Sequence, residues 1–175
     1  MCIRDRCKIC GQCFLPLLGT DKKTVGNPGK IINISSLSGI FNTPFNGAYC
    51  VSKHALESLS EIYRRELIQY GIDVVSILPG PIVSEIWEKN TGIMGVYDET
   101  DFGPYTKKAD SYIEKAKERA LPPAHISKLL LKIINTKKPK TRYFVGRNLF
   151  LTKLAIKYIP KRMMDKLIWK QLDKL

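Results

Sequence analysis

Three polar residues in the first third of the chain suggest proton transfer on an alcohol or a carbonyl. Ser36 precedes Tyr49 by thirteen residues, and Tyr49 precedes Lys53 by four. In a helix, a spacing of four places a phenol and an ammonium on one face, one turn apart. The ammonium favours the phenolate, and a nearby hydroxyl can hold the oxygen that receives the proton. The trio therefore suits general acid–base catalysis, although a half-exposed helical pair and a strand-end serine are the plain alternatives.

The residues around the trio predict the elements that position it. Residues 29–36 form an apolar run that ends in two serines, and residues 72–78 form a second run that ends in Pro-Gly-Pro. Both predict buried parallel strands. Between them, apolar residues at helical spacing predict a helix from 47 to about 70, with Gly71 at its C-cap. Because ligands bind at the carboxyl ends of parallel strands, both strand ends should face one crevice.

Four motifs occur in order: Gly-Lys-Ile-Ile-Asn-Ile-Ser-Ser, Ala-Tyr-Cys-Val-Ser-Lys-His-Ala-Leu, Leu-Pro-Gly-Pro-Ile-Val-Ser and Arg-Tyr-Phe-Val-Gly. Together, over residues 12–147, they resemble the second half of a short-chain dehydrogenase/reductase. The resemblance implies an α/β Rossmann-type fold, a doubly wound parallel sheet without its first strands. It also implies NAD or NADP, which the motifs do not discriminate, and hydride transfer between the nicotinamide and a carbonyl or secondary alcohol.

The resemblance assigns roles to individual residues. Tyr49 would be the general acid/base, Lys53 would assist it and hydrogen-bond the nicotinamide ribose, and Ser36 would orient the substrate oxygen. Both Tyr49 and Lys53 would thus contact the cofactor as well. The nicotinamide site would be shaped further by residues that follow the second strand: Pro79, Gly80, Ile82 and Ser84. For Ser84, the N-cap of a following helix is an equally good interpretation.

The family's Gly-rich turn, which sets a pyrophosphate on a helix N-terminus, has no counterpart in these 175 residues. We therefore expect a C-terminal half that is inactive by itself. Residues 1–6 show no periodicity and match nothing in the family, so we interpret them as a non-native head. Residues 7–147 would be half of the dinucleotide-binding catalytic domain, with residues 85–121 as its substrate lid, and residues 148–175 would be a basic amphipathic extension.

The lid region indicates the kind of substrate. Aromatic and aliphatic side chains are scattered through it: Trp87, Ile93, Met94, Val96, Tyr97, Phe102 and Tyr105. They favour a hydrophobic substrate, as handled by the microsomal members of the family that the chain resembles, although a surface loop with incidental aromatics would look the same. Helices near 107–120 and over 122–135 should follow.

Three early cysteines do not make a metal site. Cys7, Cys10 and Cys13 have the spacing of an iron–sulfur run, but position 17 is Leu17 where a fourth ligand would stand. The only two histidines lie far along the chain, so no metal is expected. Five cysteines without a secretory signal indicate reduced thiols in a cytoplasmic setting.

Positive charge is concentrated at the C-terminus. Of a net charge of +13, residues 137–175 hold twelve Lys and Arg against two Asp. Two basic amphipathic helices should meet at Pro160. They could pack near the substrate entrance or a partner subunit, or lie on an anionic membrane surface. Nucleic-acid binding is not expected, because no recognition motif accompanies the charge.

The sequence as a whole predicts an NAD(P)-dependent oxidoreductase that acts on a lipophilic carbonyl or alcohol through Tyr49. The alternative from another class is a non-catalytic basic membrane-surface or interaction module derived from the same fold. The resemblance further implies a homo-oligomer, in which the long helix from Gly47 forms the interface. We expect a cytoplasmic protein, with peripheral membrane contact through residues 148–175 as the open question.

Overall fold

The computed structural model describes residues 3–21, 23, 26–85, 95, 97–147 and 149–174. The chain separates into two compact units. The first contains Met1–Gly80 and Ala124–Val145, and the second contains Pro81–Pro123 and Gly146–Leu175. All the predicted strands belong to the first unit.

The first unit is built on a three-stranded parallel sheet in the order β1-β2-β3. The strands are β1 (Lys30–Ile34), β2 (Asp73–Pro79) and β3 (Arg142–Val145). The central strand β2 has five consecutive buried residues, because helices cover both of its faces. A strand buried on both faces is apolar throughout rather than alternating, which is the pattern that predicted it.

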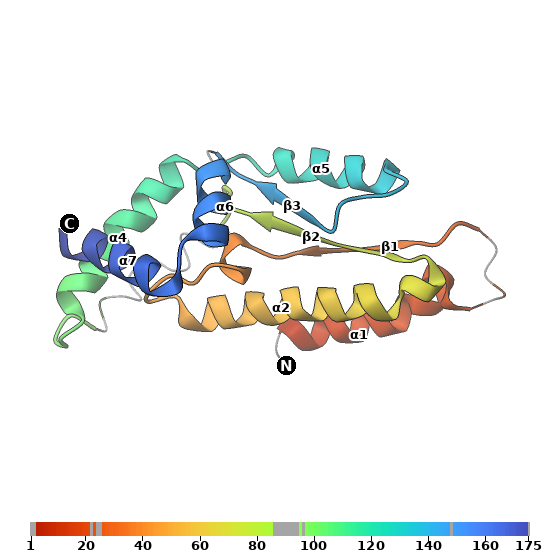
Figure 1. Ribbon diagram of the computed structural model, residues 1–175, viewed down its shortest axis with the longest axis horizontal. Helices are drawn as coiled ribbons and strands as arrows, with labels where there is room; N and C mark the ends of the chain where they lie inside the picture. Colours follow the sequence, from red (N-terminus) through yellow and green to blue (C-terminus); the bar gives the residue numbers. More distant parts are fainter. Residues whose placement is uncertain are drawn as a thin grey trace. The chain divides into compact units, whose positions relative to one another are not determined.

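Helices lie on both faces of this sheet (Figure 1). On one face, α2 (Gly47–Glu66) and α1 (Ile3–Leu15) pack on a core of Tyr63, Leu67, Ile72 and Val74. On the other, α5 (Ala124–Asn135) packs Ile133 against Val75 and Ile77. Each fully buried aliphatic side chain of this kind stabilises the fold by about 1.5–3 kcal/mol. The α/β fold with a parallel sheet is therefore confirmed.

The helix α2 matches its prediction closely. The α-helix ends at Glu66, and a 3₁₀ turn at Ile68–Tyr70 carries the chain on to Gly71. Gly71 has φ of 68°, in the left-handed region where a glycine is favoured. The predicted cap is thus confirmed, and the last turn is tighter than an α-helix.

Two further helical segments flank β1. A short helical segment, Pro16–Thr20, follows α1 and is kinked at Gly19, whose φ is 116°, and a 3₁₀ turn, Leu37–Gly39, follows β1. The helix α1 begins at Ile3, inside the segment where the sequence has no periodic pattern. The interpretation of residues 1–6 as a non-native head stays a hypothesis.

The second unit contains α4 (Gly103–Glu118), α6 (Leu149–Tyr158) and α7 (Lys161–Lys174). The helix α4 begins four residues before the predicted position, because Pro104 in its first turn suits a helix start. Tyr105 of α4 stacks on Trp169 of α7, with ring centroids 5.1 Å apart. The predicted break at Pro160 is confirmed, since α6 ends before it and α7 begins after it.

Part of the predicted lid lies outside the described part of the chain. Four of its apolar residues lie outside the described residues: Trp87, Ile93, Met94 and Val96. Of the others, Phe102 and Tyr97 are exposed. Within the described ranges, no helix has both the length and the apolar character needed to cross a bilayer.

Candidate active site

Ser36 lies where β1 ends. Its backbone is extended, and it caps the turn Leu37–Gly39. The Ser36 Oγ accepts a hydrogen bond from the backbone N–H of Ser38 at 3.1 Å. A hydroxyl that accepts one bond still has a proton to donate, so Ser36 fits both the strand-end role and the substrate-orienting role.

Tyr49 and Lys53 lie on α2, one helical turn apart. The Lys53 Nζ is 5.6 Å from the centroid of the Tyr49 ring. It also donates a hydrogen bond to the backbone carbonyl of Ile34, at 3.2 Å. Because Ile34 is the last residue of β1, this bond joins the lysine to the strand end that carries Ser36. The structure thus brings α2 and the carboxyl end of β1 together, as the predicted site requires.

Pro79 and Gly80 lie at the carboxyl end of the neighbouring strand. Pro79 is the last residue of β2 and pairs with Val145 of β3. The Gly80 N–H donates to the carbonyl of Val145 at 2.7 Å, and the Ser35 N–H donates to the carbonyl of Ile77 at 2.8 Å. Pro79 and Gly80 therefore lie at the same edge of the sheet as Ser36.

Ile82 and Ser84 belong to the second unit. Ile82 forms an isolated parallel bridge with Leu121, and the Val83 N–H donates to the Leu121 carbonyl at 3.0 Å. Ser84 is exposed. The helix that Ser84 would cap falls outside the described residues, so both interpretations of Ser84 stay open.

A buried carboxylate that pairs with a partly exposed arginine was missed by sequence reasoning. Glu57 lies one turn beyond Lys53 and is only 5% exposed. Its Oε2 accepts a bond from Arg142 Nε of β3 at 2.8 Å. The position of Glu57 in the sequence could have indicated this pair. Glu57 falls between Leu56 and Ser60 on the buried stripe of α2, where a charged residue needs a partner.

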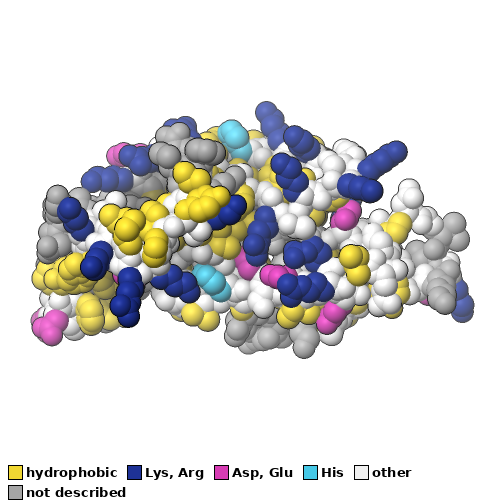
Figure 2. Space-filling model, in the orientation of Figure 1, with side chains coloured by type: hydrophobic (Ala, Val, Ile, Leu, Met, Phe, Trp, Pro, Cys, Tyr) yellow, Lys and Arg dark blue, Asp and Glu magenta, His cyan; other side chains and the backbone are white. Residues whose placement is uncertain are grey.

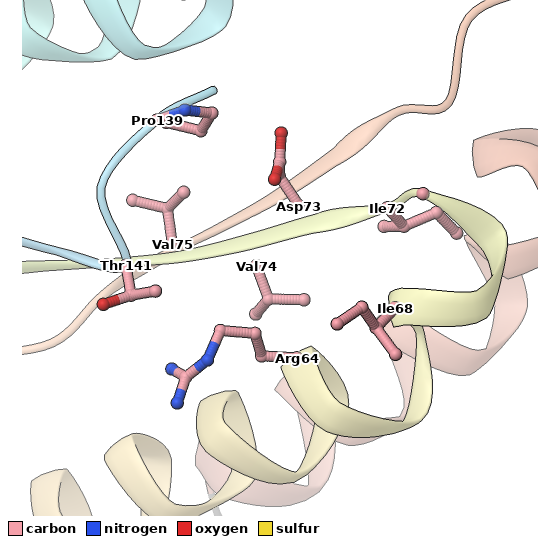
Figure 3. Close-up of a pocket in the computed structure, with 9 residues that line it drawn as sticks. Arg64, Ile68, Ile72, Asp73, Val74, Val75, Pro139 and Thr141 are labelled. Atoms are coloured by element: carbon pink, nitrogen blue, oxygen red, sulfur yellow. The ribbon is translucent and has the colours of Figure 1, made fainter. Parts of the chain in front are cut away.

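A cavity of about 250 Å³ lies at the other edge of the sheet (Figure 3). Arg64 of α2 and Ile68 of the 3₁₀ turn flank it, with Asp73 at the start of β2 and Thr141 just before β3. These are the amino ends of the strands, whereas Ser36, Pro79 and Gly80 lie at the carboxyl ends. The cavity is therefore separate from the candidate active site.

Comparison with known proteins finds related sequences. The profile of the short chain dehydrogenase family matches residues 12–92. An NADPH-dependent 3-dehydrocapnine reductase from Ornithobacterium rhinotracheale is 39% identical over 164 residues, which cover 94% of this chain and 58% of the reductase. The human 17-beta-hydroxysteroid dehydrogenase type 1 is 33% identical over 138 residues, covering 76% of this chain and 40% of the dehydrogenase.

A solved structure shows the same fold. A short chain dehydrogenase/reductase from Burkholderia phymatum in complex with NAD superposes with a TM-score of 0.59 at 18% sequence identity, over 84% of this chain and 50% of that one. The chain thus spans about half the length of the proteins it matches. By its matched motifs, its relatives and its fold, the chain belongs to the short-chain dehydrogenase/reductase family.

Proposed function

We propose that this chain is part of an NAD(P)-dependent oxidoreductase that interconverts a carbonyl and a secondary alcohol on a hydrophobic substrate. The observation that carries the proposal is the position of Lys53. Its ammonium lies beside the Tyr49 ring and bonds the end of the strand that carries Ser36. A proton donor, a cation and a hydroxyl therefore come from two elements that meet at one sheet edge.

Each residue has a part in the proposed mechanism. In reduction, the Ser36 hydroxyl donates a hydrogen bond to the substrate carbonyl oxygen and so orients it. The Tyr49 phenol gives its proton to that oxygen as the alcohol forms, and takes it back in oxidation. The Lys53 ammonium stabilises the phenolate that remains. The half-buried position of Tyr49 limits the water around the transferred proton.

The donor set of this edge fits the nicotinamide end of a dinucleotide. Lys53 would hold the ribose hydroxyls beside Tyr49, and Pro79 and Gly80 would border the ring. A cofactor contact of Ile82 and Ser84 stays a prediction from the sequence. When bound, the nicotinamide supplies or accepts the hydride. The cofactor is NAD or NADP: one relative is NADPH-dependent by name, and the solved neighbour holds NAD.

The proposed substrate is lipophilic. Among the described residues of the lid region, Phe102 is 58% exposed and Tyr97 is 46% exposed. Exposed aromatic side chains suit an apolar partner. One relative is named for a hydroxysteroid, which agrees with a substrate of this kind.

Isotope transfer tests the proposed reaction directly. The complete protein would be incubated with NADH or NADPH deuterated at C4 and with a panel of lipophilic ketones. We expect one nucleotide to deliver deuterium to the carbinol carbon of a product alcohol, detected by mass spectrometry. If neither nucleotide transfers deuterium to any ketone, while the protein is folded, the oxidoreductase proposal fails.

A second proposal concerns membrane contact. Exposed apolar side chains in α6 and α7 include Leu154, Tyr158, Met163 and Leu167. Figure 2 shows hydrophobic side chains interleaved with Lys and Arg over these helices. Basic residues beside an apolar face suit an anionic lipid surface. We propose peripheral binding through residues 148–175, either as an accessory to catalysis or as the sole role of a non-catalytic module.

A third proposal is self-association. On α2, Val51 is 64% exposed and Ile62 is 44% exposed, and they lie on one stripe because they are eleven residues apart. On α1, Ile9 and Phe14 are also exposed. Apolar helix faces of this kind suit a homo-oligomer interface.

A further inference from the structure

Two buried atoms near the candidate active site lack hydrogen-bond partners. Within the described part of the chain, these are Ser35 Oγ and Glu57 Oε1. Ser35 is 3% exposed and Glu57 is 5% exposed, so solvent does not satisfy them freely. A buried polar atom without a partner destabilises the fold by about 1–3 kcal/mol, and such atoms need a physical explanation.

Ser35 Oγ and the side chain of Glu57 both lie close to Gly39. A Cβ added to Gly39 would lie 2.9 Å from Ser35 Oγ, 3.0 Å from Glu57 Cγ and 3.1 Å from the carbonyl oxygen of Lys53. The end of β1, the turn after it and the Lys53 turn of α2 therefore converge at Gly39. Only a glycine leaves room there, because any side chain would collide with these atoms.

The chemistry of the two atoms is complementary. A serine hydroxyl can donate a proton, and an ionised carboxylate oxygen can only accept one. The other carboxylate oxygen of Glu57 already accepts from Arg142 Nε at 2.8 Å. Glu57 thus has one oxygen bound to β3 and one oxygen without a partner, and its Cγ lies beside the same glycine as the Ser35 hydroxyl, which has no acceptor.

We propose that Ser35 donates its hydroxyl proton to Glu57 Oε1, directly or through one buried water, and that Glu57 is a positioning residue for the catalytic trio. The resulting chain Ser35–Glu57–Arg142 fixes three segments to one another: the strand end next to Ser36, the helical turn of Lys53, and β3. The positioning role rests on the proposed oxidoreductase function. Misplacement of reacting groups by about 1 Å can lower turnover 10²-fold.

The test compares variants of the complete protein. Glu57→Gln keeps the shape of the side chain but replaces a carboxylate oxygen by an amide donor, and Ser35→Ala removes the hydroxyl. We expect each to lower kcat by up to about 10²-fold, with KM and the nucleotide dissociation constant unchanged. The kcat of the double variant should be no lower than that of the slower single variant, because each substitution already breaks the same hydrogen-bonded chain.

A matched control separates this role from general destabilisation. Glu61→Gln removes a carboxylate one turn further along α2, where Glu61 pairs with Arg65 at the surface, and kcat should not change. Unchanged kcat in Glu57→Gln and Ser35→Ala, or full additivity in the double variant, would overturn the proposal. If Glu57→Gln does not fold, the kcat of Ser35→Ala alone tests the proposal. That substitution only removes the hydroxyl and introduces no steric clash.

A crystal structure of the complete protein gives a readout without turnover. We expect Ser35 Oγ and Glu57 Oε1 to be joined by a hydrogen bond or by one ordered water. A different residue bonded to Glu57 Oε1 would overturn the bridge. An inactive wild type in which the bridge is present would instead overturn the proposed function, and the positioning role with it.

Discussion

The pairing of Tyr49 with Lys53 depends on helical pitch alone, which is why the sequence was enough to predict it. The Lys53 Nζ lies 5.6 Å from the phenol ring, as a spacing of four within one helix requires. The bond from Lys53 to the carbonyl of Ile34 depends instead on where β1 ends in space. Spacing along α2 could not predict that contact.

Loss of the Lys53 ammonium should lower turnover in the complete protein. Lys53→Met removes both the stabilisation of the phenolate and the bond to β1, so kcat/KM should fall by about 10²-fold or more. Lys53→Arg keeps the charge and should retain part of the activity. Lys132→Met, an exposed lysine of α5, is the control in the same steady-state assay. Equal activity of Lys53→Met and the control would contradict the assigned role.

Removal of the Ser36 hydroxyl should reduce kcat by about 10²–10³-fold, as loss of a donor to a developing oxyanion does elsewhere. The Ser36 Oγ also accepts from Ser38 N–H, so Ser36→Ala should lower the melting temperature slightly as well. Ser58→Ala, on the exposed side of α2, controls for loss of a hydroxyl. A Ser36→Ala enzyme with normal kcat would contradict the substrate-orienting role of Ser36, and only its role as a helix cap would remain.

Glu57 marks the limit of residue-scale prediction. Periodicity identified the buried stripe of α2 from its apolar members, and Glu57 lies on that stripe between Leu56 and Ser60. Its partner Arg142 is 85 residues away, so no local pattern joins them. Arg142 contacts Glu57 because the strand order β1-β2-β3 places β3 next to β2 in the sheet.

At the scale of elements, strands were predicted more sharply than helix ends. The strand β2 is buried on both faces, so its apolar run has clear limits on either side. The start of α4 was misplaced because charged residues at its first turns hid the helical pattern, and Pro104 was the better signal. Segments 86–94 and 96 lie outside the described residues.

The layer formed by α5 and β2 gives a stability prediction. Ile133 is fully buried against Val75 and Ile77, whereas its neighbour Ile134 is 54% exposed. Ile133→Ala should therefore lower the free energy of unfolding by about 2–5 kcal/mol, and Ile134→Ala should change it by less than about 0.5 kcal/mol. Denaturant unfolding of the complete protein measures both. Similar losses for the two variants would show that α5 packs on the sheet through a different face.

At the scale of the whole molecule, charge was predictable and burial was not. The sequence places twelve Lys and Arg among residues 137–175, but it does not tell which apolar side chains of that segment are covered. In the structure, Tyr158 is 65% exposed and Trp169, although stacked on Tyr105, is 55% exposed. Membrane contact is proposed because charge and exposed apolar surface occur together.

Vesicle binding checks that proposal. The complete protein should co-sediment with vesicles of phosphatidylserine and phosphatidylcholine but not with phosphatidylcholine alone, and added salt should release it. Each lysine near an anionic surface contributes about 1 kcal/mol, so Lys166→Glu with Lys170→Glu should abolish most binding. Lys128→Glu with Lys132→Glu, on α5, is the matched control. Equal losses in both double variants would exclude α7 as the binding surface.

The most direct test of the central claim is the rate of NADH or NADPH oxidation by the complete protein with lipophilic ketones, for wild type, Tyr49→Phe and Tyr158→Phe. Tyr158 is a close control because Lys157 Nζ lies 5.1 Å from its ring, yet α6, which carries it, contributes no residue to the candidate active site. We predict that Tyr49→Phe lowers kcat by about 10²–10⁴-fold while nucleotide binding persists, and that Tyr158→Phe keeps wild-type turnover. A Tyr49→Phe enzyme as fast as the wild type would contradict the account.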